Sequence, residues 1–121
     1  FETIIIEDKL EKFKNCREVL EKICKNTQYL IINTDRNLEY QEIEKQITYG
    51  LNQKATVTVS SISDIDILIY WQKSIKNKEG TVIDIEEKRI KKIGKNSLKI
   101  YEILIIYAFL KVYNQKIIDE I

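Results

Sequence analysis

The first half of the chain alternates between helical and strand-like patterns of apolar residues. Residues 7–26 place apolar side chains on one helical stripe and Glu and Lys on the other faces, which predicts an amphipathic helix. Residues 28–33 (Q-Y-L-I-I-N) form a short β-branched apolar run, typical of a buried strand. After a turn, residues 38–51 return to helical spacing, and Asn37 is suited to cap this second helix.

The pattern between residues 54 and 80 supports two interpretations. Residues 54–60 (K-A-T-V-T-V-S) alternate and are β-branched, so they predict a strand. Residues 61–79 offer serines as helix caps, aspartates for the first turn and Gly80 as a stop, and their length suits a helix. The alternation of residues 64–67 (D-I-D-I) is typical of a strand instead. We interpret 61–79 as a helix that is buried on two sides.

The last part of the chain predicts a long hairpin. Residues 81–93 begin as an alternating strand and then become basic, and residues 94–97 (G-K-N-S) indicate a turn. Residues 98–110 are apolar on two faces and are interpreted as a long strand, with a helix as the alternative. Residues 111–121 then form a final helical turn or a frayed tail.

This order of elements predicts an α/β fold. After the first helix it reads β-α-β-α-β-β, which we expect to form a four-stranded mixed sheet with two helices on one face. The division is an N-terminal amphipathic helix (1–27), a main domain (28–113) and a C-terminal tail (114–121). The alternative is a small OB-type β-barrel, which would follow if residues 64–75 form a strand.

Composition narrows the function. The 121 residues, 44% hydrophobic, suffice for one packed core, and the net charge is +1. The absence of histidine excludes His-dependent nucleophiles and His-ligated metals. The function favoured below involves no enzyme activity, cofactor or metal. Cys16 and Cys24 lie too far apart on one helix to form a disulfide and are expected to be buried.

The longest apolar run, 103–110, falls short of the roughly 20 residues that span a bilayer. Without a visible secretory signal, we expect a reducing compartment, cytoplasmic or nuclear, and no membrane partner.

A cluster of basic residues near the end of the predicted hairpin is the best candidate for a function. A flexible β-arm with this charge can lie along a phosphate backbone and release counterions, largely without regard to sequence. The alternative is a solvated hairpin whose charges protect a sheet edge from aggregation. The candidate residues are Lys88, Arg89, Lys91, Lys92 and Lys95.

Three acidic residues form a second candidate. Asp64, Asp66 and Asp84 resemble the D-x-D pattern with which polymerase-β-type nucleotidyltransferases hold magnesium. That family also needs a Gly-Ser turn upstream, whereas Gly50 is followed here by Leu51. Carboxylates that cap a helix are therefore the favoured interpretation.

Two neighbouring aromatic residues are candidates for contact with a partner chain. Tyr70 and Trp71 lie in the core or at a dimer interface, because aromatic anchors dominate the energetics of interfaces. The apolar face of residues 7–26 packs on its own domain or docks on another chain, and both alternatives remain open.

The order of elements resembles the Alba superfamily, which includes archaeal chromatin proteins and Alba-like subunits of ribonuclease P and its MRP relative. The resemblance covers residues 28–110, and its nearest local likenesses are 54–59 (K-A-T-V-T-V) and 97–103 (S-L-K-I-Y-E-I). It implies an Alba-like α/β sandwich that forms homodimers or heterodimers. It also implies contact with nucleic acid through the basic hairpin and the loop after the first strand, where Arg36 is the cation. The loop at residues 60–63 lacks the glycine and arginine of the family.

From these patterns we expect a non-catalytic subunit that binds RNA or DNA in a ribonucleoprotein or chromatin-like complex, as part of a dimer. A protein–protein scaffold subunit without nucleic-acid contact is the alternative. A magnesium-dependent nucleotidyltransferase is the third.

Overall fold

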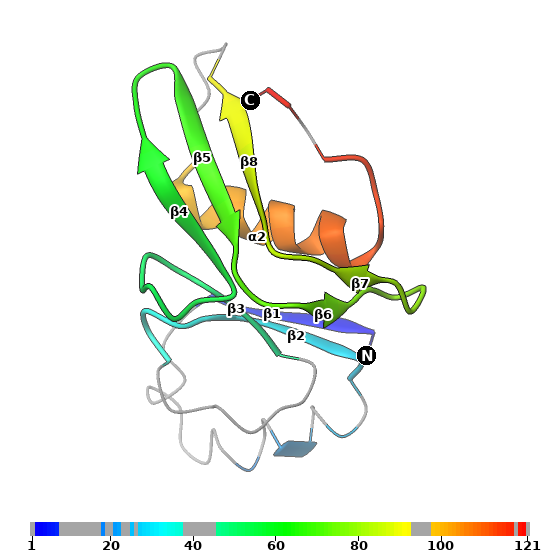
Figure 1. Cartoon of the computed structure of the whole chain (residues 1–121). Helices are drawn as coiled ribbons and strands as arrows, with labels where there is room; N and C mark the ends of the chain where they lie inside the picture. Colours follow the sequence, from blue (N-terminus) through cyan, green and yellow to red (C-terminus); the bar gives the residue numbers. More distant parts are fainter. Residues whose placement is uncertain are drawn as a thin grey trace.

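The computed structural model describes residues 2–7, 18, 21–22, 25, 27–37, 46–92, 98–117 and 119–120. Among these residues, a six-stranded mixed sheet carries helix α2 on one face (Figure 1). The strand order is β1-β2-β3-β4-β5-β8, with β1 and β8 at the two edges. The α/β class expected from the sequence is therefore confirmed, and the described sheet is open rather than closed into a barrel.

One half of the sheet is parallel. Strands β1 (Thr3–Ile6), β2 (Tyr29–Asn33) and β3 (Gln46–Tyr49) lie side by side in the same direction. Every residue of β2 is buried, as is usual for a central parallel strand whose two faces are both covered. The continuous run of β-branched and aromatic residues in β2 fits this position, because neither face needs polar side chains.

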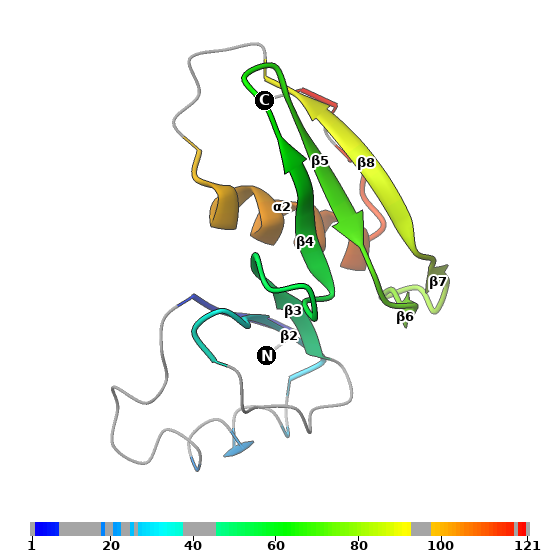
Figure 2. The ribbon, with the colours of Figure 1, turned by 60° about the vertical axis from the view of Figure 1, so that its left-hand side comes forward.

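The other half of the sheet is antiparallel. It consists of β4 (Val57–Ile62), β5 (Asp66–Trp71) and β8 (Glu86–Lys91). The two halves meet at a single residue pair, Tyr49 with Val57. The seven residues between these strands bring the start of β4 beside the end of β3, so the antiparallel half crosses the parallel half at a wide angle (Figure 2).

Helix α2 (Ile100–Val112) covers one face of the sheet. A short hairpin of β6 (Ile75–Lys76) and β7 (Val82–Ile83) lies beside it and is joined to its end, because Lys78 donates its backbone N–H to the carbonyl of Val112 at 2.8 Å. The core between helix and sheet is built from the following buried side chains: Tyr29, Ile31, Ile47, Tyr49, Val57, Ile67, Ile69, Trp71, Ile90, Ile103, Leu104, Tyr107, Ala108 and Val112.

Two predicted helices are wrong in the described residues. The helix expected over 38–51 is contradicted at residues 46–49, which form β3, whereas residues 38–45 lie outside the described residues. The helix expected over 61–79 is replaced by β5 and β6. Burial along β5 alternates strictly, with Ile67, Ile69 and Trp71 facing α2, so the two-residue period was the correct signal.

The predicted terminal hairpin is also wrong in its second half. Residues 100–112 form α2 instead of a strand, which was the alternative left open for 98–110. The strands predicted at 28–33 and 54–60 are confirmed as β2 and β4, and 81–93 contains β7 and β8. The predicted turn at 94–97 lies outside the described residues.

The N-terminal prediction is correct in part. Within the helix expected over 7–26, the described residues Glu18, Glu21, Lys22 and Lys25 are helical and exposed, as expected for its polar face. Its apolar stripe and both cysteines lie outside the described residues. Residues 3–6 form β1 and belong to the main sheet.

Candidate functional site

The predicted basic cluster lies on β8, whose alternation divides it between two sides. Lys88 faces the same side as Ile90, toward α2, whereas Arg89 and Lys91 face the opposite side. Sequence reasoning placed these cations on one flexible arm, but β8 is instead an edge strand paired along its length with β5. The contiguous run in the sequence therefore does not form one contiguous charged surface.

Most of the cluster is engaged within the chain. Arg89 donates from Nη1 to Oδ2 of Asp66 at 3.0 Å, and its side chain remains 66% exposed. Lys88 forms an ion pair with Asp119, whose pKa is lowered by this hydrogen bond. Lys92 donates from Nζ to the carbonyl of Ser63 at 2.8 Å. Lys95 lies outside the described residues.

The face of β4, β5 and β8 that points away from α2 is open. In Figure 1, α2 lies behind these strands, and no described helix covers the side toward the viewer. Tyr70 and Leu68 stand half-buried on this face, with Glu87 opposite Tyr70 and Arg89 opposite Leu68 on β8, and Lys91 follows next along that strand. We call the surface formed by Leu68, Tyr70, Glu87, Arg89 and Lys91 the open face. It combines an aromatic ring with exposed cations.

Trp71, the second predicted interface residue, belongs to the core. Its side chain is fully buried, its indole N–H donates to the carbonyl of Lys73 at 2.6 Å, and its ring lies 6.3 Å from that of Tyr107. Tyr107 in turn donates to Glu86 at 2.7 Å. Of the two predicted places for Trp71, core or interface, the structure shows the core, because alternation in β5 turns its side chain toward α2.

The predicted acidic candidates do not converge. Asp66 is paired with Arg89, and Asp64 and Asp84 are exposed on separate turns. The parts of the chain that the structure describes contain no group of three or more acidic, cysteine or histidine side chains able to hold a metal ion.

Arg36, the predicted cation of the first loop, lies away from β8, at the carboxyl end of β2. Its guanidinium donates to the carbonyl of Glu7 at 3.4 Å and sits 5.7 Å from the ring centroid of Tyr101. The neighbouring Asp35 carboxylate accepts from the backbone N–H groups of Leu51 and Asn52, at 2.7 and 2.9 Å. These contacts join the ends of β2 and β3, which is where ligands commonly bind in α/β sheets.

The side chains around this loop act mainly as structural clamps. Tyr101 donates to Asp35 at 2.8 Å, and Asn33 accepts from the backbone N–H groups of Asp35 and Arg36. The Nδ2 group of Asn33 is buried without a hydrogen-bond partner within 3.5 Å. The hydrogen bond to the Asp35 carboxylate, together with burial, raises the pKa of the neighbouring Tyr101 phenol.

Comparisons with known proteins add no relative. No family model matches the chain, and neither the curated proteins nor the solved structures contain a significant match. The residues that the structure describes include no helix with the length and apolar character needed to cross a bilayer.

Tyr49 is buried at the end of β3, and the pH at which its phenol ionises therefore tests the structure. Burial raises the pKa of Tyr49 to about 12, helped by the nearby Glu7 carboxylate. Because the folded value exceeds the ordinary value of 10.0, stability from this phenol is complete below pH 10 and is lost as pH rises toward 12. We expect ultraviolet titration to show a late ionisation step near pH 12 that is absent in Tyr49→Phe. An unchanged titration curve in that variant would contradict the burial of Tyr49.

Tyr70 and Asp66 are candidates in the sequence as well, but for roles other than those that the structure gives them. Tyr70 was considered only as an interface or core residue, although strand alternation would have placed it opposite Trp71 on an open face. Asp66 was considered as a helix cap or metal ligand, whereas it pairs with Arg89 across the sheet. No local signal reports this pairing, because the two residues are joined only by the register of β5 and β8.

Proposed function

We propose that the protein is a non-catalytic nucleic-acid-binding subunit that holds a single strand on its open face. The observation that carries the proposal is that Tyr70 shares an uncovered antiparallel sheet face with Arg89, which lies opposite Leu68, and Lys91, which lies opposite Asp66, while Glu87 lies directly opposite Tyr70. An aromatic ring can stack on a base, and neighbouring cations can contact phosphates on either side of it. This arrangement favours a single strand, whose bases are free to stack, over a duplex.

The ion pairs on β8 are compatible with phosphate binding. The Arg89 side chain is 66% exposed, and exposed ion pairs contribute only about 0–1 kcal/mol. A phosphate can therefore replace Asp66 as the partner of Arg89 at small cost. Lys91 points to the same face and is exposed. Arg36 is at the other end of the sheet and is a secondary contact in this proposal.

The proposal is tested by the salt dependence of binding to a fluorescent single-stranded RNA. Replacing Arg89 and Lys91 with alanine should lower the slope of log K against log salt by about 1.4, or about 0.7 for each lost phosphate contact. Tyr70→Ala should cost about 1–3 kcal/mol at every salt concentration, because stacking is lost without a change of charge.

Two further variants serve as controls. Lys54→Ala with Lys73→Ala removes two exposed cations outside β8 and should leave the slope nearly unchanged. Asp66→Asn should strengthen binding, because Arg89 loses its competing carboxylate. The proposal fails if wild-type binding is absent, or if both double variants change the slope equally.

A protein–protein module is the second candidate, and the tip of the β4–β5 hairpin favours it. Ile62 and Ile65 are 51% and 72% exposed, although hydrogen bonds from and to Ser63 hold the turn firmly. We propose that this tip mediates the dimerisation that the sequence predicts. Ile65→Ser should then shift sedimentation toward the monomer in the absence of nucleic acid, whereas Val82→Ser, at another exposed apolar site, should not.

The finer assignment to an Alba-like sandwich remains part of the proposal. Its support is that β2, β4 and β8 lie where the resemblance expects strands, whereas β3 and β5 stand in place of its two helices and α2 in place of its last strand.

A further inference from the structure

The outer edge of β8 exposes backbone groups that can pair with another strand. Lys92 donates its backbone N–H to the carbonyl of Ile65 at 2.7 Å, which sets the hydrogen-bonding phase of the pair β5–β8. In that phase every second residue of β8 turns its N–H and C=O toward β5, and the others turn theirs to the edge. The residues with outward backbone groups are Glu87, Arg89 and Lys91.

The C-terminal segment of the chain already pairs with the end of this edge. Lys91 donates its outward N–H to the carbonyl of Asp119 at 2.9 Å, and Lys91 and Glu120 form a parallel β-bridge. In Figures 1 and 2 the segment leaves the end of α2 and runs up alongside β8. The outer edge of β8 at Lys91 therefore has space for a segment that runs parallel to it.

Charge indicates what kind of strand the edge prefers. Lys88 forms its ion pair with the Asp119 carboxylate, so an acidic side chain of the added segment meets a cation of β8. Among the other charged residues of β8, Glu87, Arg89 and Lys91 point to the open face and Glu86 is paired with Lys111, so Lys88 is the cation that meets an added segment. An extended segment with a carboxylate opposite Lys88 is thus electrostatically matched to this edge.

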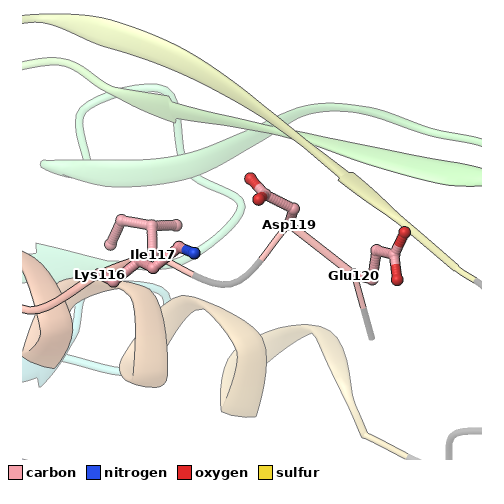
Figure 3. Close-up of a pocket in the computed structure, with 4 residues that line it drawn as sticks. All are labelled: Lys116, Ile117, Asp119 and Glu120. Atoms are coloured by element: carbon pink, nitrogen blue, oxygen red, sulfur yellow. The ribbon is translucent and has the colours of Figure 1, made fainter.

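The present occupant covers only part of the edge. Among the described residues, Glu87 and Arg89 have no backbone partner on their outward side. The ion pair to Asp119 is solvated, since that side chain is 64% exposed, and such pairs contribute little. An open pocket of about 440 Å³ is lined by Lys116, Ile117, Asp119 and Glu120 of the segment itself, so the segment is not closely packed there (Figure 3).

We propose that the free edge of β8 binds an extended acidic peptide of a partner protein by parallel strand addition, with a carboxylate on Lys88. The chain's own Asp119 and Glu120 occupy the end of the edge until this peptide replaces them. The two proposals are tested separately, because this one rests on the Lys88 side chain and on backbone groups of β8, whereas the nucleic-acid function rests on the side chains of Tyr70, Arg89 and Lys91.

The test uses a labelled synthetic peptide with the sequence of residues 113–121 (Y-N-Q-K-I-I-D-E-I) and the full-length chain. In the variant Asp119→Lys with Glu120→Lys, the chain's own segment is repelled from Lys88 while the edge is kept. Fluorescence anisotropy should show about tenfold or tighter binding of the peptide to this variant than to the wild type, because competition is removed. A peptide with lysine in place of aspartate should bind neither chain.

Two controls locate the peptide on the edge. Adding Lys88→Glu to the displaced variant should abolish binding, whereas adding Lys73→Glu, an equal change of charge on an exposed residue after β5, should not. Hydrogen exchange should show new protection of the Glu87 and Arg89 amides on peptide binding.

Equal affinity for both chains, no binding to either, or binding without protection of those two amides would overturn the proposal. Loss of RNA binding alone would overturn only the nucleic-acid function. Asp119→Asn, which keeps the backbone contact and removes the charge, should bind the peptide with intermediate affinity.

Discussion

Replacing Trp71 with alanine should destabilise the protein by about 3–5 kcal/mol, the range for truncating a large buried aromatic side chain. Trp71 is fully buried between β5 and α2, beside Tyr107, and its indole N–H is hydrogen-bonded. The substitution leaves a cavity and an unpaired carbonyl at Lys73. Urea unfolding followed by far-ultraviolet circular dichroism measures the loss.

The neighbouring residue is the matched control for this prediction. Tyr70→Ala removes an aromatic ring of similar size from the open face of the same strand, where it is only half-buried. It should cost about 1 kcal/mol, within the range of ordinary substitutions. Equal losses for Trp71 and Tyr70 would contradict the strand register, because a helix over these residues would not alternate their burial.

Replacing Gly50 with alanine should destabilise the protein by about 3 kcal/mol. A Cβ at this position would lie 2.6 Å from Oδ1 of Asp35, and the φ angle of +156° is one that side-chain-bearing residues rarely adopt. Backbone strain of this kind costs about 1–3 kcal/mol. Moving the Asp35 carboxylate also weakens its bonds to Leu51, Asn52 and Tyr101, each worth about 0.5–1.5 kcal/mol.

Two further variants separate the two causes of the expected loss at Gly50, which are backbone strain and the clash of the new Cβ with the Asp35 carboxylate. Gly80→Ala introduces a side chain at φ +84° with no atom within 4 Å, so it should cost only about 1 kcal/mol of strain. In an Asp35→Ala background, Gly50→Ala should cost less than it does in the wild type, because the collision is gone. Additive losses in the thermal or urea unfolding of the double variant would exclude the predicted contact.

The parts of the fold that were predicted correctly are those whose signal is local. Residues 29–33 begin with a short apolar run that contains two β-branched isoleucines and suits a buried strand, and β4 begins with plain alternation. Residues 61–79 were misinterpreted because Leu68 and Tyr70 fill the outer face of β5 with apolar atoms. The two-residue period of apolar side chains is therefore masked in the sequence, and the length of residues 61–79 favours a helix.

The helix α2 was missed for a related reason. Its sequence, I-Y-E-I-L-I-I-Y-A-F-L-K-V, is apolar on all sides, so neither a helical nor a strand period stands out. Whether such a segment forms a helix or a strand depends on the elements that pack against it. Here the sheet buries Leu104, Tyr107 and Ala108, while Phe109 on another side is 41% exposed.

The candidate site could be predicted as a list of cations but not as a surface. Lys88 and Arg89 are neighbours in sequence and point to opposite sides of β8. Their partners, Asp119 and Asp66, lie 31 and 23 residues away along the chain. Contacts over such separations depend on strand order and register, which the pattern of one sequence does not specify.

The division of the sheet into two halves has a consequence for the order in which the chain folds. Strands β4 and β5 are joined by a turn of three residues, so their pairing closes a short loop, whereas β1 and β2 are separated by 22 residues. Closing longer loops costs more chain entropy and slows the search for contacts. The meander from β4 to β8 is therefore the natural nucleus, and the parallel strands dock onto it afterwards across the Tyr49–Val57 junction.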